Sequence, residues 1–288
     1  MTVDPKTSQL SPETVPLGTG LPTREELFVH YPAKFSWYQL KVFVNSGDLG
    51  LLKRDRALQR RYNAWAVGIK AEYGSIVNYL CTYRLLWGQP DTLTLLRSSL
   101  DPAPSANDAP VKPRRSSGEL PHSPQMHPRT SSRTRPELYF IAMNDWPYSV
   151  PPEVEHSLIW TRLPIYPPSL PAPAASPLSA RLHQDGLWGF TGNDSPPPSP
   201  SVMLSCLPAL AEWGITEDKL IRTPRGTAEE EAEVRRYGEE IATFVKRRWV
   251  EREWETAWFV NPPRLQSVPG LAHIHVFARR KIPDEVAN

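Results

Sequence analysis

Two histidines near the end of the chain have the types and spacing that could support chemistry. His273 and His275 alternate with Ile274 and Val276, and this period-two pattern predicts a strand that carries both imidazoles on one face. Paired imidazoles can bind a metal, transfer a proton or attack an electrophile. The same pattern also fits two hydrogen-bonded histidines on a half-exposed strand that have no chemical role.

A loop rich in proline and glycine precedes this strand and carries further polar groups. It spans residues 261–272, and its Pro-Pro and Pro-Gly steps break the backbone. Another histidine lies upstream, after an Asn-Asp-Trp-Pro-Tyr turn. We expect His275 and His273 to be the reactive pair. The residues that could join them in binding a ligand are Ser267, Gln266, Asn261, His156 and Asp145.

A metal site is a weaker alternative. A His-x-His metal centre needs further ligands close behind it, yet Ala278, Arg279 and Arg280 follow the pair and no histidine comes later. His156 and a carboxylate such as Asp145 could complete a ligand set. Because the pattern supplies so few ligands, we expect no metal and no cofactor.

The strongest helical pattern lies between residues 58 and 87. Apolar residues recur there at steps of three and four, which predicts the buried face of a long helix. The glycine and serine at positions 74 and 75 predict a bend or a break. The apolar positions are Leu58, Tyr62, Trp65, Ile69, Tyr73, Ile76, Leu80, Tyr83 and Trp87.

Basic residues gather around the beginning of this helix. Cations are unfavourable at a helix N-terminus, where the backbone dipole is positive. A contact with a phosphate would explain their position, and a solvated basic face is the other interpretation. The residues are Lys53, Arg54, Arg56, Arg60 and Arg61.

Two capping boxes mark further helices. Ser36 with Gln39 predicts a short helix that ends near Asn45, and Thr227 with Glu230 predicts a longer one. Strands are predicted over 137–143 and 156–161, and another pair flanks the loop of residues 261–272. This order of helices and strands predicts an α+β fold, a largely antiparallel sheet with packed helices.

Proline-rich stretches divide the sequence. The 288 residues include 33 prolines, and composition predicts a disordered tail over 1–20 and a single α+β domain over 21–288. Two Pro-rich disordered insertions are expected within it, at 99–135 and 168–204. The first carries six basic residues and one acidic residue between positions 111 and 135. It could dock an acidic partner or serve only as a solubilising insertion.

Charge and cysteine content narrow the class of protein. The formal net charge is +2 and there are two cysteines. So small a net charge does not favour nucleic acid as a partner, and two distant cysteines fit a reducing compartment. The first twenty residues lack the apolar core of a signal peptide, and no apolar run is long enough to cross a bilayer. We therefore expect a cytoplasmic protein with no membrane contact.

Several segments together resemble the fungal N-acetylglucosamine-induced protein family, a domain of unknown function. The resemblance covers nearly all the sequence outside the two insertions. It implies a cytosolic protein induced by an amino sugar and brings no established reaction. The segments are Phe35-Ser36-Trp37, Gly47-Asp48-Leu49-Gly50-Leu51-Leu52-Lys53-Arg54, Lys70-Ala71-Glu72-Tyr73-Gly74-Ser75-Ile76, Asn144-Asp145-Trp146-Pro147-Tyr148 and the stretch from Asn261 to Val276.

The C-terminal motif is also similar to that of histidine-triad hydrolases and nucleotidyl transferases. Gln266-Ser267-Val268 precedes His273-Ile274-His275-Val276-Phe277. The resemblance implies a histidine-triad-like fold in which His275 attacks an α-phosphate of a nucleotide or nucleotide sugar. It further implies that the His273 carbonyl orients that imidazole and that Ser267 steadies the phosphate charge.

The motif departs from the superfamily at two points. Residues 269–272 separate Val268 from the first histidine where the superfamily has one residue, and Phe277 stands where a third histidine belongs. Because triad catalysis ordinarily uses that third histidine, a second function is weighed beside the enzyme. It is a non-catalytic protein that binds a small phosphorylated ligand, either a sugar phosphate or a nucleotide sugar.

Overall fold

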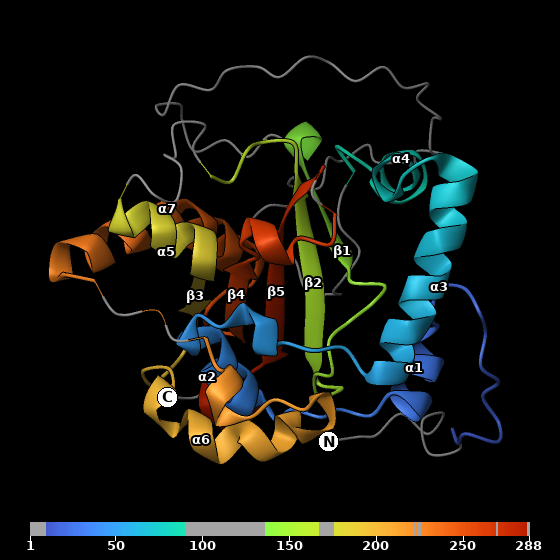
Figure 1. The fold of residues 1–288 in the computed structure, drawn as a ribbon, viewed down its shortest axis with the longest axis horizontal. Helices are drawn as coiled ribbons and strands as arrows, with labels where there is room; N and C mark the ends of the chain where they lie inside the picture. Colours follow the sequence, from blue (N-terminus) through green and yellow to red (C-terminus); the bar gives the residue numbers. More distant parts are fainter. Residues whose placement is uncertain are drawn as a thin grey trace.

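Five antiparallel strands form one sheet at the centre of the molecule (Figure 1). The computed structural model describes residues 10–89, 136–166, 176–221, 223, 226–268 and 270–286. The strand order is β1-β2-β5-β4-β3. The strands are β1 (Tyr139–Met143), β2 (Val154–Thr161), β3 (Leu187–Thr191), β4 (Trp254–Val260) and β5 (Ala272–Arg280). The predicted α+β class and antiparallel sheet are confirmed.

Helices cover both faces of this sheet. On one face, which we call the apolar face, Ile274 and Val276 of β5 pack with residues of α5 (Pro177–Asp185) and α7 (Ala228–Arg248). The opposite face carries His273, His275 and Phe277, and we call it the histidine face. Because both faces are covered, β5 is buried on both sides over most of its length.

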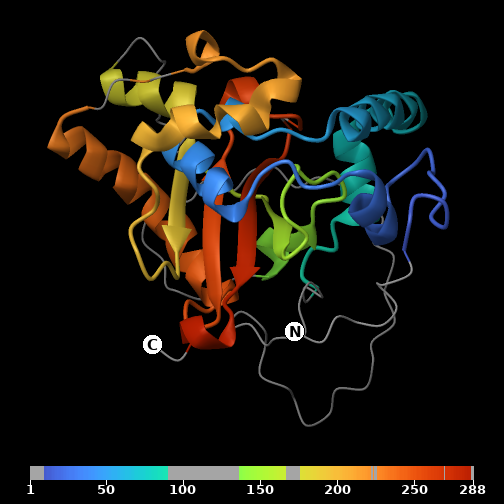
Figure 2. The same cartoon turned by 90° about the horizontal axis from the view of Figure 1, so that it is seen from below.

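Two groups of helices share the histidine face. Near β3 and β4 it packs against α2 (Trp37–Ser46) and α6 (Met203–Cys206), which lie close together in both views (Figures 1 and 2). Near β1 and β2 it packs against α3 (Arg56–Tyr73) and α4 (Ile76–Tyr79). The histidines lie where these two clusters meet.

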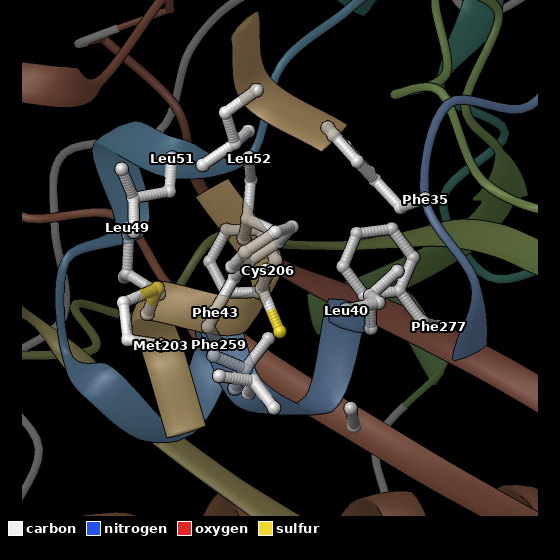
Figure 3. Packing of buried hydrophobic residues seen from close by; sticks show 14 of the residues in the cluster. Phe35, Leu40, Phe43, Leu49, Leu51, Leu52, Met203, Cys206, Phe259 and Phe277 are labelled. Atoms are coloured by element: carbon white, nitrogen blue, oxygen red, sulfur yellow. The ribbon is translucent and has the colours of Figure 1, made fainter. Parts of the chain in front are cut away.

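The cluster under α2 is almost entirely apolar. Phe43 of α2 lies close to Phe259 of β4, and Met203 and Cys206 of α6 close the other side (Figure 3). Phe277 belongs to the same cluster. Burial of aromatic side chains supplies much of the driving force for packing these elements.

Local sequence signals place the predicted helices. The Ser36 hydroxyl accepts from the Gln39 amide at 3.2 Å, and Gly47 ends α2 with a φ of 78°. Gly74, with a φ of 76°, separates α3 from α4, after which Leu80–Arg84 forms a π-helical turn, η3. Thr227 caps α7 with a complete capping box. These predictions are confirmed, and the additional helix α1 (Arg24–His30) begins with a similar box at Thr23.

Short helical segments complete the described structure. They are η2 (Leu49–Leu51), η4 (Pro136–Leu138), η6 (Pro200–Val202), η7 (Leu207–Trp213), η8 (Glu217–Lys219), η9 (Pro263–Leu265) and α8 (Pro283–Val286).

The predicted disordered insertion at 168–204 is wrong over residues 176–204. That stretch holds α5 and β3, and β3 pairs with β4 along its whole length. Gly189 lies so close to Trp258 that an added Cβ would be 2.5 Å from the indole ring. The glycine that suggests a loop is therefore needed for the strand to approach its neighbour.

The predicted tail at 1–20 is also too long. Val15 is buried, and its carbonyl oxygen lies 2.6 Å from His30 Nε2. The amide of Gly18 donates to the Glu26 carboxylate. Val15 and Gly18 thus tie this stretch to α1, although most of its other residues are exposed. The predicted insertion at 99–135 lies outside the described residues, as do residues 1–9.

Candidate functional site

The pairing of β2 with β5 brings two of the predicted histidines together. Leu158 pairs with His275, and His156 pairs with Phe277. His156 and His275 are therefore diagonal neighbours on one face of the sheet. Their rings approach so closely that Nε2 of His156 lies 3.0 Å from Nδ1 of His275.

A backbone amide decides which nitrogen of His156 carries its proton. The Tyr148 amide donates to His156 Nδ1 at 3.1 Å, so this nitrogen must be unprotonated. In a neutral ring the proton then resides on Nε2, which donates to His275 Nδ1. This direction of donation places the His275 proton on its own Nε2.

Asn261 lies next to His275 and extends the hydrogen-bonded pair of His156 and His275. We call these three side chains the relay. The Asn261 atom nearest to His275 Nε2 is the carboxamide Nδ2, at 3.2 Å. Since that ring nitrogen carries a proton, the carboxamide must be turned over about its Cβ–Cγ bond for its oxygen to accept the hydrogen bond. The backbone carbonyl of Asn261 accepts in turn from Gln266 Nε2 at 3.4 Å. Two predicted loop residues, Asn261 and Gln266, are thus connected to the histidine pair.

Both histidines of the relay are deeply buried and uncharged. His156 is 1% exposed and His275 is 5% exposed, and burial lowers the pKa of each well below its ordinary value. The His275 ring stacks on Phe259 at 4.5 Å and lies nearly parallel to Tyr148 at 5.6 Å. Aromatic rings therefore enclose His275, and both imidazoles are neutral at pH 7.

His273 is adjacent to the relay and has a separate partner. Its ring lies 5.1 Å from the His275 ring and 4.6 Å from that of Trp160. Nδ1 of His273 donates to the Leu271 carbonyl at 3.0 Å. Burial lowers the pKa of His273, so this histidine is also neutral at pH 7.

Asp145 lies in the turn between β1 and β2. Among the described residues, its carboxylate is bonded to Arg84 and to none of the histidines. Its carboxylate accepts from Arg84, with Nε at 3.1 Å, and burial raises its pKa while Arg84 opposes that rise. Beside it, Asn144 Oδ1 accepts from the Trp146 amide at 3.0 Å. Nδ2 of Asn144 then lies against the protonated Nε2 of His156 at 3.3 Å, which is a contact between two donors.

Ser267 is exposed on the loop before β5. Within the described part of the chain, its hydroxyl makes no hydrogen bond to any of the histidines. Its neighbour Val268 is buried against α3 and α4. The structure therefore brings His156, His275 and Asn261 into one connected group and leaves Ser267 outside it.

Arg54 is a further group near the relay, and it holds an unusual position. Nε donates to the Trp146 carbonyl at 2.8 Å and Nη1 donates to Gln59 at 2.7 Å. The guanidinium lies over the rings of Tyr62, at 4.8 Å, and Tyr148, at 5.5 Å. Burial lowers its pKa, and its charge lowers the pKa of both relay histidines.

The other basic residues near the start of α3 are engaged elsewhere or solvated. Arg61 forms an ion pair with Glu26 at 2.9 Å, and Arg56 donates to the Glu212 carbonyl at 2.9 Å. Arg60 is exposed. Arg54 is thus the member of the predicted basic cluster that faces the histidines. Its only sequence signal is a cation at a helix N-terminus, and nothing in the sequence links it to a strand about 100 residues later.

Two features of the described residues bear on function. In these parts of the chain, no group of three or more His, Cys, Asp or Glu side chains is arranged to hold a metal ion. No helix there is sufficiently long and apolar to span a bilayer.

Comparisons with known proteins place the chain in a family. The family model described as "Protein of unknown function (DUF3605)" matches residues 36–171 and 221–279. Those ranges contain Arg54, Tyr148 and the whole relay. No curated protein matches the chain. Among solved structures, "Crystal Structure of HTC1" is similar at 19% identity over 88% of this chain and 91% of that one, with a TM-score of 0.33. That score is too low to relate the two folds.

Proposed function

The chain belongs to the DUF3605 family of proteins of unknown function, and from this premise we propose that it binds a small phosphorylated ligand without catalysing a reaction. Arg54 is the anchor for the phosphate. Tyr148, which lies between Arg54 and the histidines, forms the floor beneath the ligand. The bound class is a sugar phosphate or a nucleotide sugar.

The observation that carries this proposal is the free edge of the Arg54 guanidinium. Two of its nitrogens are bonded, and Nη2 has no hydrogen-bond partner among the described residues. No carboxylate in these residues lies within ion-pair distance of it. A partly buried cation without an anion is costly, and a phosphate would supply both the charge and the acceptor oxygens that the guanidinium lacks.

The geometry of His275 favours binding over catalysis. As a nucleophile, His275 would need an unprotonated Nε2 exposed to the phosphorus atom. The relay instead places a proton on that nitrogen, directed at Asn261, while Phe259 and Tyr148 enclose the ring. In the proposed function the relay holds Tyr148 and the loop of residues 261–272 in place beneath the ligand.

Calorimetry with Arg54→Gln tests the proposal. The probes are glucosamine 6-phosphate and UDP-N-acetylglucosamine, titrated into the full chain. A charge-assisted hydrogen bond contributes about 1.5–3 kcal/mol, so the variant should bind about ten- to a hundredfold more weakly. Arg60→Gln changes an exposed arginine in the first turns of α3, which begins two residues after Arg54; it is the matched control and should bind like the parent. Equal binding by both variants, or no binding by the parent, would contradict the proposal.

A histidine-triad-like hydrolase or nucleotidyl transferase is the second candidate. It is favoured by one observation, the two neutral imidazoles joined at 3.0 Å, because neutral imidazole is the attacking form. In this function His275 attacks, His273 orients it and Asp145 and Ser267 contact the substrate. Cleavage of a nucleoside phosphoramidate that is abolished by His275→Ala and retained by Arg60→Gln would support it. No turnover across phosphoramidates and nucleotide sugars would reject it.

Three further parts of the proposal follow from the family resemblance and from composition. We propose that the protein is cytoplasmic and that N-acetylglucosamine induces its synthesis. We also propose that an acidic partner binds the basic residues between 111 and 135, which lie outside the described residues. Fractionation of cells grown with and without N-acetylglucosamine tests location and induction. Unchanged protein levels would reject induction.

A further inference from the structure

Two tryptophans and a tyrosine lie beside Arg54, on the side of α3. The guanidinium is 4.8 Å from the Tyr62 ring, and the Trp146 ring packs edge-on against Tyr62 at 5.4 Å. Trp65, about one turn further along α3, lies 5.2 Å from Trp146 and 6.0 Å from Tyr62. We call Tyr62, Trp65 and Trp146 the aromatic cluster. Arg54 thus has two sets of rings beside it, this cluster and Tyr148.

The aromatic cluster continues into rings that are open to solvent. Tyr62 and Trp65 are only partly buried. Tyr79, at the end of α4, lies 5.5 Å from Trp65, and Tyr83 of η3 follows at 5.7 Å from Tyr79 with 56% of its surface exposed. Single exposed apolar side chains are ordinary, whereas contiguous ones mark binding sites. A row of accessible rings therefore begins at the cation.

Trp146 carries a buried donor that the protein leaves unused. This residue is 5% exposed, and its indole Nε1–H has no hydrogen-bond partner among the described residues. An indole nitrogen can only donate, and a buried donor without an acceptor is unfavourable. The Trp146 carbonyl meanwhile accepts from Arg54 Nε at 2.8 Å. The residue that holds Arg54 in place thus also offers a hydrogen bond to an oxygen atom of a ligand.

We propose that the aromatic cluster binds the base of a nucleotide sugar, with Trp65 as the stacking residue. This inference rests on the proposed function, in which Arg54 holds a phosphate, and it selects one of the two ligand classes named there. A sugar phosphate has no planar group beyond its phosphate. A nucleotide sugar has a sugar on one side of its diphosphate and a base on the other, so it contacts Tyr148 and Trp65 while its diphosphate lies at Arg54.

The chemistry of the rings fits a base. Every base has a flat π face, and aromatic side chains stack on it whatever its identity. Trp65 presents the largest side-chain ring, and its contacts with Trp146 and Tyr79 hold that ring in place before a ligand arrives. Such preorganisation lowers the entropic cost of binding. The Trp146 Nε1–H donates to an oxygen of the ribose or of the base.

Calorimetry with Trp65→Leu tests the inference, using UDP-N-acetylglucosamine and glucosamine 6-phosphate with the full chain. The parent should bind UDP-N-acetylglucosamine at least about fivefold more tightly, because only this probe has a base to stack. Trp65→Leu should lose this preference and keep the parent's affinity for glucosamine 6-phosphate, which also shows that the variant is folded. Tyr38→Leu changes an aromatic residue of α2 that is 50% exposed. It is the matched control and should bind both probes like the parent.

A second variant and a second measurement cover the case in which Trp65→Leu does not fold. Trp65→Phe retains a smaller ring and should bind UDP-N-acetylglucosamine more weakly than the parent. A base stacked on an indole quenches its fluorescence, so UDP-N-acetylglucosamine should quench the parent's tryptophan emission and quench that of Trp65→Phe less. Glucosamine 6-phosphate should quench neither. Equal quenching of the two proteins by UDP-N-acetylglucosamine would overturn the role of Trp65.

The outcomes separate this inference from the proposed function. A parent that binds neither probe would reject both. A parent that binds both probes with equal affinity, or a folded Trp65→Leu that binds both like the parent, would leave Arg54 as the phosphate anchor and reject base stacking. Tighter binding of a short uridine oligonucleotide than of UDP-N-acetylglucosamine would assign the rings to single-stranded RNA and overturn the inference.

Discussion

The two faces of strand β5 are equally buried and are stabilised in different ways. Ile274, Val276 and Ala278 face α5 and α7, and their packing needs no specific partner. His273 and His275, on the opposite face, carry ring nitrogens whose hydrogen bonds must be satisfied. Neighbours from three separate segments contact these nitrogens: the His156 ring, the Asn261 side chain and the Leu271 carbonyl.

This difference shows where the chain can carry a function. The apolar face tolerates changes that preserve volume, because packing there is largely non-directional. On the histidine face, each hydrogen-bond donor needs an acceptor opposite it. The protonation and orientation of one side chain therefore determine those of the next. In the proposed function, the contacts of Tyr148 with Arg54 and with the histidines would connect a ligand to the relay, whereas the apolar face supports the sheet from behind.

The largest loss of stability is expected when elements that form the apolar face are removed. Deleting residues 176–204 takes away α5 and β3 together with the buried Leu182 and Leu187. Because domains are stable by only about 5–15 kcal/mol, we expect no folded protein, as judged by circular dichroism and gel filtration. Deletion of 99–135 is the matched control and should cost about 1 kcal/mol or less. Folded protein lacking 176–204 would show that this face does not depend on β3.

Truncation of one side chain on the apolar face has the next largest effect. Trp258 is 2% exposed and packs against Gly189 and Gly238. Trp258→Ala leaves a large cavity and should lower the free energy of unfolding by about 3–5 kcal/mol in urea titrations. Its indole nitrogen has no hydrogen-bond partner in the described residues, so the loss measures packing. A loss under 1 kcal/mol would mean that the face repacks.

On the histidine face, the expected loss of folding stability arises from a hydrogen-bond donor that is left without its acceptor. His275→Phe conserves most of the volume and leaves His156 Nε2–H without its acceptor, which should cost about 1–3 kcal/mol. The double variant with His156→Phe should recover part of that loss, giving a coupling of at least about 0.5 kcal/mol in a double-mutant cycle. Strict additivity of the two changes would mean that the 3.0 Å contact contributes nothing.

The last expected effect is the response to pH, and it distinguishes the two faces directly. The pKa values of His156 and His275 are lowered in the folded protein, so the unfolded chain binds more protons just below its histidine pKa of about 6.5. Stability is fully present above that value and falls with decreasing pH, by up to about 1.4 kcal/mol per pH unit for each histidine.

Urea titrations between pH 7 and pH 5.5 measure this slope. The variant with both relay histidines replaced by phenylalanine should show a shallower slope, since two of the groups that bind protons on unfolding are gone. Trp258→Ala should retain the slope of the parent. A parent protein whose stability does not change in this interval would contradict the assignment of neutral buried imidazoles.

Local signals in the sequence determined helices α2, α3 and α7 and the alternation in β5. The capping boxes at Ser36 and Thr227 and the break at Gly74 depend on contacts within a few residues, so they can be read without a fold. The period-two pattern likewise placed His273 and His275 on one face. It did not show that helices cover this histidine face as well, so that β5 is buried on both sides rather than half-exposed.

Only the tertiary structure decided which residues meet. The strand β3 is short, carries a central glycine and lies in a Pro-rich region, so only its pairing with β4 and the space left for Trp258 make it a strand. Arg54 reaches the histidines because α3 packs beside β2, and Asn261 does so because β4 pairs with β5. Such contacts depend on register and helix packing between residues far apart in the chain, which no local pattern encodes.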